Sequence, residues 1–405
     1  MPDFGIRGKT LCEGCGIVSC VKGWRFVTIG KRGRLAGNIL SAGVRVANWG
    51  LASVPWLCLD PAMIFASDNW AGASQPVMDA LAANNTDFAA AYGRDPLTDR
   101  VTERLGEMFE RPVEVYFTAT GTAANALSMA ACARPGGLVL TSETAHVYCD
   151  EWGAAEFFTH GMKMVPLPTV AGKITPDGVA GVLDANPEGS RFGRPVALSL
   201  TQASECGTVY TPEEVRALTG IAASRDLVCH MDGARFANAL VSLGATPAEV
   251  TWKAGIDVLS FGGTKNGCWC AEAVVVFNPD RLPDLVTHRS RSGHLFSKSR
   301  FVAAQFDGYL ANDHWRELAT HANAMATRLG EGLAAAGHRL AYPVEANEVF
   351  PVLDLATIAR LREAGAAFYE WPEVEAGEDT SCVRLVTSFA TKSEEVARFL
   401  EIAAR

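Results

Sequence analysis

The sequence predicts an α/β protein with a mostly parallel β-sheet that is covered by helices on both faces. Two observations predict this fold class. Short apolar runs recur between residues 113 and 277, and most are separated by stretches with helical spacing. Several of these stretches begin with a Thr-Pro pair, which is typical of a helix start. Buried strands that alternate with helices form parallel sheets, because the crossover helices cover both faces.

The first helical segment is PLTDRVTERLGEMFE, residues 96–110. Its apolar residues are three or four positions apart, on one helical face: Leu97, Val101, Leu105 and Met108. VEVYFT follows at 113–118 and predicts a strand, and the Ala-rich GTAANALSMAACA at 121–133 predicts a helix.

Six further apolar runs predict the remaining strands of this sheet. They are LVLT at 138–141, MVPL at 164–167, VALSL at 196–200, LVCHM at 227–231, IDVLSF at 256–261 and AVVVF at 273–277. Two of the intervening helices have clear start signals, since Thr175 and Thr211 each stand at an N-cap before a proline. Glu214 adds a capping box to the second.

The chain divides into three parts by composition. After about residue 311, long helices such as HWRELATHANAMATRLGEGLAAA accompany a few strands, EVFPVL and CVRLVT. We therefore expect a large domain over residues 63–311 and a smaller C-terminal α+β domain over 312–405. No internal repeat or low-complexity tract is visible.

Residues 1–62 differ from the rest of the chain. They carry eight Lys or Arg against three Asp or Glu, a charge of +5, which leaves −14 for the remainder. They show no clear helical or alternating period, and a new pattern begins at Met63. We expect an atypical extension, disordered or a mis-assigned start, that folding does not need. A targeting peptide fits less well, because the apolar stretch begins only after KRGR at 31–34.

The composition argues against several classes of protein. Apolar residues make up 48% and charged residues 20%, as in ordinary globular proteins. No apolar run reaches eighteen residues, so no membrane span is expected, and the net charge of −9 argues against a nucleic-acid partner. Most of the eleven cysteines stand singly, which predicts reduced thiols in the cytoplasm. Cys12, Cys15 and Cys20 lack a second close pair, so we expect no metal site.

Candidate site residues follow the strands, because ligands of open α/β sheets bind beyond the carboxyl ends of the strands. After VEVYFT, Thr120, Gly121 and Thr122 stand at a helix start that is either a simple cap or a phosphate site. After LVCHM, Asp232 is either a turn former or an anion that holds a cationic nitrogen, with Arg235 three residues on.

Two more strands are followed by chemically distinctive side chains. Lys265, in FGGTKNGCWC, is either a surface lysine or an amine able to form a Schiff base. His146, in SETAHVYCDE, is either structural or lies over a flat ligand. A phosphate site, a strand-end carboxylate, a lysine and a stacking histidine together are the parts that hold pyridoxal phosphate.

Seven motifs in this order complete the pattern: FASDN, AYGRDPLT, TGTAAN, ETAHV, HMDGARFANA, FGGTKNG and CVRLVT. From about residue 63 to the C-terminus the chain resembles the L-threonine aldolase family of pyridoxal-phosphate enzymes, and in particular its low-specificity and phenylserine aldolase branch. The resemblance implies the aspartate-aminotransferase-like fold, known as fold type I.

The resemblance also implies roles for cofactor-binding residues. Lys265 would form the Schiff base with pyridoxal phosphate, and Asp232 would pair with its pyridine nitrogen. Arg235 would lie near the ring hydroxyl, and Gly121 and Thr122 would bind the phosphate. In addition, His146 would stack on the ring.

Substrate contacts are implied in the same way. Ser67 and Arg384 match positions that hold the substrate carboxylate, for which a bidentate guanidinium is well suited. Tyr92 and Lys298 resemble residues that reach the site of a neighbouring subunit, so we expect a homodimer or homotetramer with shared active sites. Some relatives place a second histidine after the VALSL strand, whereas this chain has Glu205 there.

The implied reaction is the retro-aldol cleavage of L-β-hydroxy-α-amino acids (threonine, allo-threonine and phenylserine) to glycine and an aldehyde. His146 and Glu205 are both candidates for the base that takes the proton of the hydroxyl, and we favour His146. One alternative is a β-eliminating enzyme on the same fold. A remoter alternative is a transcription regulator with a basic N-terminus, but residues 1–62 lack a helix-turn-helix pattern.

Overall fold

The computed structural model describes residues 20–21, 24–25, 63–86, 88–187 and 189–405. The chain forms two units, Met1–Cys58 and Leu59–Arg405. In the first unit, β1 (Cys20–Val21) pairs antiparallel with β2 (Trp24–Arg25). The prediction of an unneeded extension over 1–62 lies outside the described residues. The same holds for Cys12, Cys15 and the side chain of Cys20, at which we expect no zinc.

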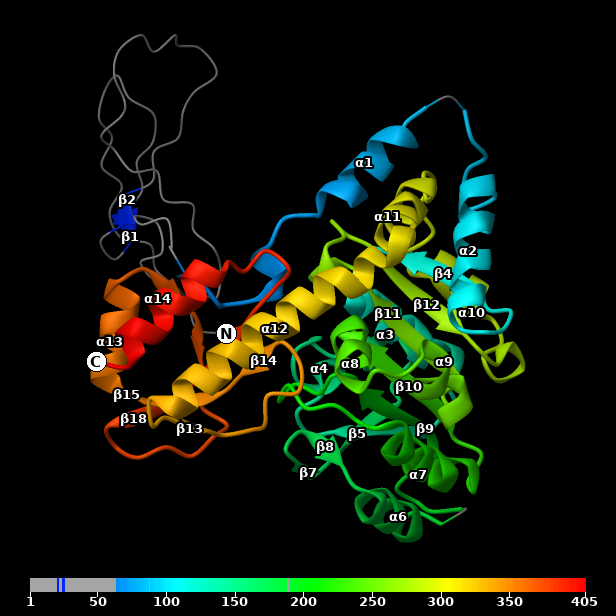
Figure 1. Cartoon of the computed structure of the whole chain (residues 1–405). Helices are drawn as coiled ribbons and strands as arrows, with labels where there is room; N and C mark the ends of the chain where they lie inside the picture. The colour runs from blue at the N-terminus through cyan, green and yellow to red at the C-terminus, as the bar shows by residue number, and fades with distance from the viewer. Residues whose placement is uncertain (1–19, 22–23, 26–62, 87, 188) are drawn as a thin grey trace. The chain divides into compact units, whose positions relative to one another are not determined.

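A seven-stranded sheet is the centre of the second unit (Figure 1). Its order is β4-β12-β11-β10-β9-β5-β6. Strand β12 runs antiparallel to both of its neighbours, and the other neighbouring pairs are parallel. The strands are β4 (Glu114–Thr118), β5 (Gly137–Ser142), β6 (Lys163–Leu167), β9 (Arg194–Thr201), β10 (Val228–Gly233), β11 (Val258–Gly262) and β12 (Glu272–Val276). The predicted mostly parallel α/β sheet is therefore confirmed.

Both faces of this sheet are covered by helices. On β11, Leu259 and Phe261 belong to a core cluster with residues of helices α2, α7, α8 and α11, whereas Val258 belongs to a second cluster with residues of α3, α5 and α10. Successive residues of a strand thus face an apolar core on opposite sides of the sheet, which explains why these strands appear in the sequence as continuous apolar runs. The helices are α1 (Gln75–Ala83), α2 (Pro96–Met108), α3 (Gly121–Ala131), α4 (His146–Cys149), α5 (Ala154–Phe158), α6 (Pro176–Ala185), α7 (Pro212–Ala223), α8 (Phe236–Leu243), α9 (Pro247–Val250), α10 (Leu285–Arg291) and α11 (Arg300–Leu310).

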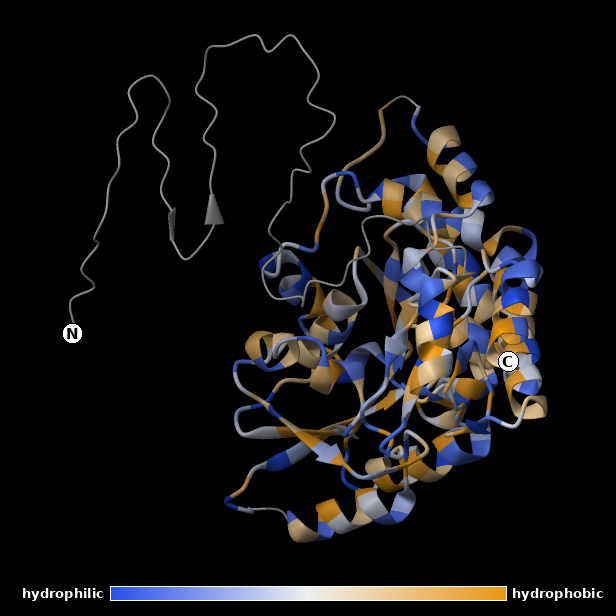
Figure 2. Cartoon of the chain, turned by 90° about the vertical axis from the view of Figure 1, so that its left-hand side faces the viewer, coloured by the Kyte–Doolittle hydropathy of each residue, from blue (hydrophilic) through white to orange (hydrophobic). Residues whose placement is uncertain are grey.

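The helix starts follow their capping residues. The side chain of Thr175 accepts a hydrogen bond from the backbone N–H of Gly178, and Thr211 and Glu214 form the predicted capping box at α7. In Figure 2 the outer helices alternate between hydrophilic and hydrophobic residues, as expected for helices that pack one side on a core. No helix among the described residues is long and apolar enough to cross a membrane.

The C-terminal part forms a second, smaller sheet. The long α12 (His314–Ala335) leads into it and also packs on α8, one of the helices that cover the central sheet (Figure 1). Strand β3 (Met63–Ile64) pairs in parallel with β16, and the two form a separate two-stranded sheet. The remaining elements are β13 (Arg339–Leu340), β14 (Glu348–Val349), β15 (Pro351–Asp354), α13 (Leu355–Glu363), β16 (Ala366–Ala367), β17 (Tyr369–Glu370), β18 (Thr380–Val386) and α14 (Ser393–Ala403). Short elements outside both sheets are β7 (Thr169–Val170), β8 (Lys173–Ile174) and the 3-10 turns η1 (Asp68–Trp70), η2 (Trp252–Ala254), η3 (Thr264–Asn266), η4 (Pro279–Arg281) and η5 (Ala311–Asp313).

Candidate active site

The strand register aligns the predicted residues along the carboxyl edge of the central sheet. Asp232, near the end of β10, lies between Thr201 of β9 and Ser260 of β11. Lys265 follows β11 directly, in η3. This edge is the position where ligands of open α/β sheets bind. A cavity of about 930 Å³ lies at the opposite edge, near Gly137 of β5, and none of the predicted residues lines it.

Asp232 is a buried carboxylate with only 3% of its surface exposed. Its Oδ2 accepts a hydrogen bond from Nδ2 of Asn125 at 2.8 Å, and its Oδ1 accepts one from the backbone N–H of Ala234 at 3.0 Å. The hydroxyl of Thr201, its neighbour in register, is buried without a hydrogen-bond partner among the described residues. The turn-former interpretation is therefore incomplete, because this carboxylate also faces the helix α3.

A chain of hydrogen bonds connects Asp232 with His146. The same Nδ2 of Asn125 lies 2.8 Å from Oε1 of Glu151, and that oxygen lies 2.9 Å from Nδ1 of His146. The side chain of Glu151 is fully buried, whereas that of His146 is 36% exposed. The hydrogen bond with Glu151 raises the pKa of His146 above its ordinary value, although partial burial opposes the shift.

Lys265 is half-buried and lies in a tightly packed turn. A Cβ atom at Gly262 would lie 2.6 Å from the carbonyl oxygen of Ala234, so only glycine allows the backbone to approach this closely. No hydrogen bond or ion pair holds Lys265 within the described part of the chain. Burial raises the pKa of the neighbouring Glu272 to about 7, although the hydrogen bond from Thr264 and the charge of Lys265 counteract it.

Arg235 forms a buried ion pair in the same region. Its Nε donates to Oδ2 of Asp68 at 2.8 Å, and its Nη2 lies 3.5 Å from Oε1 of Glu348. Burial disfavours the guanidinium charge, but Asp68 and Glu348 outweigh this effect and hold the pKa of Arg235 above its usual range. Burial likewise raises the pKa of Asp68, but Arg235 and Lys265 lower it below its ordinary value.

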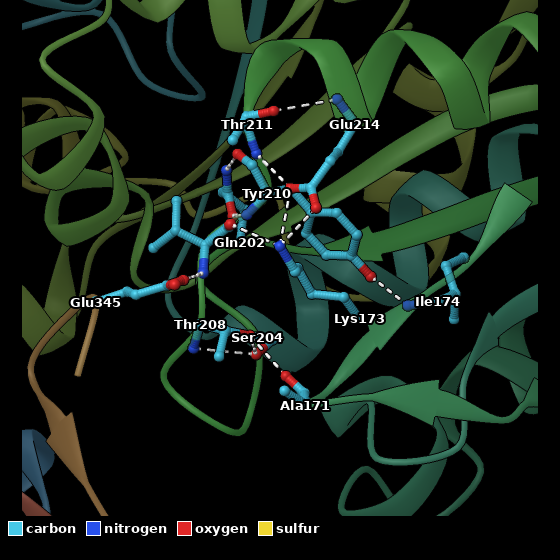
Figure 3. A network of polar contacts seen from close by, with 11 residues as sticks. Ala171, Lys173, Ile174, Gln202, Ser204, Thr208, Tyr210, Thr211, Glu214 and Glu345 are labelled. Carbon is cyan, nitrogen blue, oxygen red and sulfur yellow. Dashed lines mark hydrogen bonds and ion pairs between the residues drawn. The ribbon is translucent and has the colours of Figure 1, made fainter. Parts of the chain in front are cut away.

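Glu205 is buried on a loop that is fixed by a dense polar network (Figure 3). The amide of Gln202 donates to the carbonyl of Tyr210 and accepts from its N–H, at 2.8 and 3.0 Å. The hydroxyls of Ser204 and Thr208 lie 2.7 Å apart. Across the loop, the N–H of residue 209 donates to Glu345 at 2.7 Å. The loop therefore holds Glu205 close enough to raise the pKa of His146 through its charge.

The two predicted carboxylate-binding residues lie on different elements. Ser67 caps η1, where its hydroxyl accepts from the N–H of Asn69 at 3.1 Å. Arg384 lies on β18 with its guanidinium over the ring of Trp371, 5.1 Å from the ring centre. Its Nε is buried without a hydrogen-bond partner among the described residues. Arg384 also acts on the ionisation of Glu348, which connects it with the Arg235 ion pair.

Gly121 and Thr122 form the first turn of α3, as predicted. Thr120 is the N-cap, and its hydroxyl accepts from the N–H of Ala123 at 3.2 Å. The first N–H groups of a helix lack intrahelical partners and attract anions. A Cβ atom at Gly121 would meet no atom within 4 Å, so there is open space beside this turn.

Tyr92 and Lys298 lie together, and both are exposed. The N–H of Tyr92 donates to the carbonyl of Ser297 at 3.0 Å, and 54% of the Tyr92 surface is accessible. Lys298 is also exposed. Their role toward a neighbouring subunit stays a prediction.

Four buried residues of this site had no role in the sequence interpretation: Asp68, Asn125, Glu151 and Glu348. The first three stand inside the motifs FASDN, TGTAAN and SETAHVYCDE, and the fourth begins EVFPVL. For Asp68, Asn125 and Glu151, the presence of a candidate residue in the same motif could therefore have indicated that they belong to the site. No signal in the sequence connects Glu348 with the site.

The fold and the strand-end lysine and aspartate define an α/β enzyme of the aspartate-aminotransferase-like class, fold type I. The structure resembles that of aspartate aminotransferase from Thermus thermophilus, with a TM-score of 0.60 and 20% identity over 83% of this chain and 88% of that chain.

The beta-eliminating lyase family model matches residues 65–356. The chain is 44% identical to the low specificity L-threonine aldolase of Pseudomonas aeruginosa, over 75% of this chain and 88% of the relative. Its structure matches a threonine aldolase from Leishmania major with a TM-score of 0.79 and 30% identity, over 84% of this chain and 98% of that chain. This protein belongs to the beta-eliminating lyase family, among the L-threonine aldolases, which confirms the family resemblance.

Proposed function

We propose that this protein is a pyridoxal-phosphate-dependent aldehyde-lyase that cleaves threonine, allo-threonine and phenylserine to glycine and an aldehyde. The observation that carries the proposal is the placement of a half-buried Lys265 and a buried Asp232 at neighbouring strand ends. The names of the two threonine aldolases from Pseudomonas aeruginosa and Leishmania major support the same reaction.

The residues present fit the cofactor. The open space beside Gly121 at the start of α3 suits a phosphate, and the unpartnered hydroxyl of Thr201 stands next to Asp232. The amine of Lys265 has no hydrogen-bond or ion-pair partner among the described residues. When bound, pyridoxal phosphate would supply an electron-accepting ring for the charge left by a broken Cα–Cβ bond.

Each residue has a distinct task in this proposal. Lys265 would hold the cofactor through its amine. Asp232 would keep a proton on the ring nitrogen, because a buried carboxylate favours the charged form of its partner. Gly121 and Thr122 would bind the phosphate, and His146 would pack over the ring.

The substrate is held by Ser67 and Arg384. A guanidinium binds a carboxylate through two parallel hydrogen bonds, and the free Nε of Arg384 is available for one of them. His146 takes the proton of the β-hydroxyl, since Glu151 fixes its Nδ1 and leaves Nε2 for the substrate. Glu205 stays the second candidate for this base.

Arg235 keeps in this proposal the position near the ring hydroxyl that the family resemblance implies. Its guanidinium is already engaged by Asp68 and Glu348. It would contact the ring hydroxyl while Asp68 remains its ion-pair partner.

Assembly and location extend the proposal. Tyr92 and Lys298 are exposed together, as expected of residues that serve a second subunit, so we propose a homodimer or homotetramer. The seven cysteines from Cys132 to Cys382 are all free, which fits a reducing cytoplasm.

One assay separates the proposed reaction from β-elimination. Purified protein with pyridoxal phosphate is given threonine, allo-threonine or phenylserine, and glycine plus aldehyde are measured beside ammonia plus keto acid. The proposal expects glycine and aldehyde in equal amounts, and Lys265→Ala should abolish both. Ammonia and a keto acid as the main products would favour the β-eliminating alternative instead.

A further inference from the structure

Glu348 is a buried carboxyl group that the proposed reaction does not use. It begins β14 and has no exposed surface. Neither of its carboxylate oxygens has a hydrogen-bond partner among the described residues, and its ion-pair contact is Nη2 of Arg235 at 3.5 Å. A buried carboxyl without hydrogen bonds is costly unless it has a function or holds a proton.

The register of the second sheet places Glu348 on the same face as Arg384. Glu348 pairs with Val386 of β18, and Val349 pairs with Leu385. Opposite residues of an antiparallel pair share a face, as do residues two apart on one strand. Arg384 is therefore a diagonal neighbour of Glu348. Val349 and Leu385 face the other way, into the apolar core of this part.

Four charged side chains act on the ionisation of Glu348. Arg235 comes from the start of α8 and Arg384 from β18, and both favour its ionised form. Glu205 of the fixed loop and Asp68 of η1 carry like charges that disfavour it. The same loop packs directly on it, since a Cβ at Gly207 would lie 3.0 Å from Cβ of Glu348. The adjacent Cys206 thiol has its pKa raised, chiefly by burial and also by Glu348.

We propose that Glu348 is a proton-accepting residue of the substrate carboxylate site, which takes up a proton when a substrate carboxylate binds Arg384. This inference rests on the proposed function, which assigns the substrate carboxylate to Arg384. The bond that forms is O–H on Glu348, and the proton comes from the solvent. The residue thereby favours substrates with a single small carboxylate and disfavours a second negative charge near Arg384.

The physical reason is competition between two carboxylates for the same cations. An incoming carboxylate adds a negative charge beside Asp68, Glu205 and Glu348, while Arg235 and Arg384 are the nearby cations. Burial already raises the pKa of Glu348, against the effect of the two arginines. An additional anion raises it further, so that protonation removes the repulsion. The neutral carboxyl can then donate a hydrogen bond to the bound carboxylate.

The sign of the pH effect follows because the pKa of Glu348 is higher in the liganded protein than in the free protein. Below the pKa of free Glu348 the proton is already present, and binding takes up none. Between the pKa of the free and of the liganded protein, binding takes up as much as about one proton per site. Affinity therefore falls as the pH rises through this window, by about tenfold for each pH unit.

The test uses the protein loaded with pyridoxal phosphate and 3-hydroxybutyrate, which is threonine without its amino group. This ligand cannot displace Lys265, so the protons of an amine do not enter the measurement. Calorimetric titration in two buffers of different ionisation enthalpy, repeated from pH 6 to 9, gives the number of protons taken up. Wild-type protein should take up more protons than Glu348→Gln, by as much as about one per site, and its dissociation constant should depend more steeply on pH. Any pH dependence that remains in Glu348→Gln belongs to other groups of the site, such as His146.

Two further variants make the result specific. Glu348→Asp keeps a carboxyl group and should keep the proton uptake. This variant also provides a test if Glu348→Gln folds poorly. Glu370→Gln removes an exposed carboxyl of β17 in the same sheet and should behave as wild type. Equal uptake by wild type and Glu348→Gln would overturn the inference, as would no uptake by wild type at any pH. If neither 3-hydroxybutyrate binds nor threonine is cleaved, the proposed function itself fails.

Discussion

Oε1 of Glu151 lies 2.9 Å from Nδ1 of His146, and the same oxygen accepts a hydrogen bond from Asn125 at 2.8 Å. Since Asn125 also donates to Asp232, one amide connects the candidate base with the candidate partner of the cofactor nitrogen. The hydrogen bond with Glu151 fixes the orientation of the imidazole and raises its pKa. The pH dependence of turnover therefore depends on Glu151.

Glu151→Gln should move the acidic limb of the pH profile. A base must be neutral to accept a proton, so wild-type turnover should rise with pH through the raised pKa of His146. The variant lacks the charge that raises this pKa, and its limb should shift to lower pH. Its maximal rate should fall about ten- to a hundredfold, as part of the 10²–10⁴ that a positioned base supplies. Measured kcat between pH 5.5 and 9 checks this, and an unshifted limb would assign the base to another group.

Arg384→Lys should weaken substrate binding more than it slows turnover. Lysine keeps the charge but loses the bidentate geometry and the stacking on Trp371. We expect the KM for threonine to rise about ten- to a hundredfold, with a smaller change in kcat. Arg339→Lys, at an exposed arginine of β13, is the matched control and should leave both constants unchanged. An unchanged KM in Arg384→Lys would remove this residue from the carboxylate site.

Glu272→Gln should stabilise the protein at high pH. Burial raises the pKa of Glu272 from 4.5 to about 7, so the stability contributed by its neutral form is fully present below pH 4.5 and is lost as the pH rises through 7. Each pKa unit corresponds to about 1.4 kcal/mol, so the variant should gain up to about 3 kcal/mol at pH 8. Urea unfolding at pH 8 and pH 5 measures the difference. A gain that is as large at pH 5 would contradict this cause.

A chain that begins at Met63 should keep its activity and its Tm. Met63 and Ile64 pair with Ala366 and Ala367, and Phe65 packs in the core of the C-terminal part. A chain that begins after Phe65 loses these contacts, and its Tm should fall by several degrees. Thermal unfolding and aldehyde release compare the two truncations with the full chain. Loss of either property in the Met63 chain would show that residues 1–62 contribute to folding or turnover.

The central sheet was predictable because most of its inner strands are buried on both faces, as β5, β10, β11 and β12 are throughout. Short continuous apolar runs such as IDVLSF and AVVVF are typical of strands that are buried on both faces, and they correspond to β11 and β12. The strand-end rule then selected Asp232 and Lys265 without knowledge of the strand order. The resemblance to a family added Ser67 and Arg384, which no periodicity would have identified.

The rest of the site depends on contacts between distant segments. Glu348 reaches Arg235 only because β14 of the second sheet packs on the loop that contains Gly207. Glu151 and Asn125 face each other across 26 residues of sequence. Spacing along the chain reports the faces of single elements, but it does not report which elements meet, so such pairs require the folded structure.

The covalent bond of Lys265 to the cofactor can be located by chemical reduction and peptide mapping. The protein is treated with pyridoxal phosphate and then with borohydride, which makes an imine to lysine permanent, and its peptides are mapped by mass spectrometry. We expect the added mass on Lys265, and no specific labelling in Lys265→Ala. Specific labelling of a different lysine, or none in the wild-type protein, would contradict this expectation.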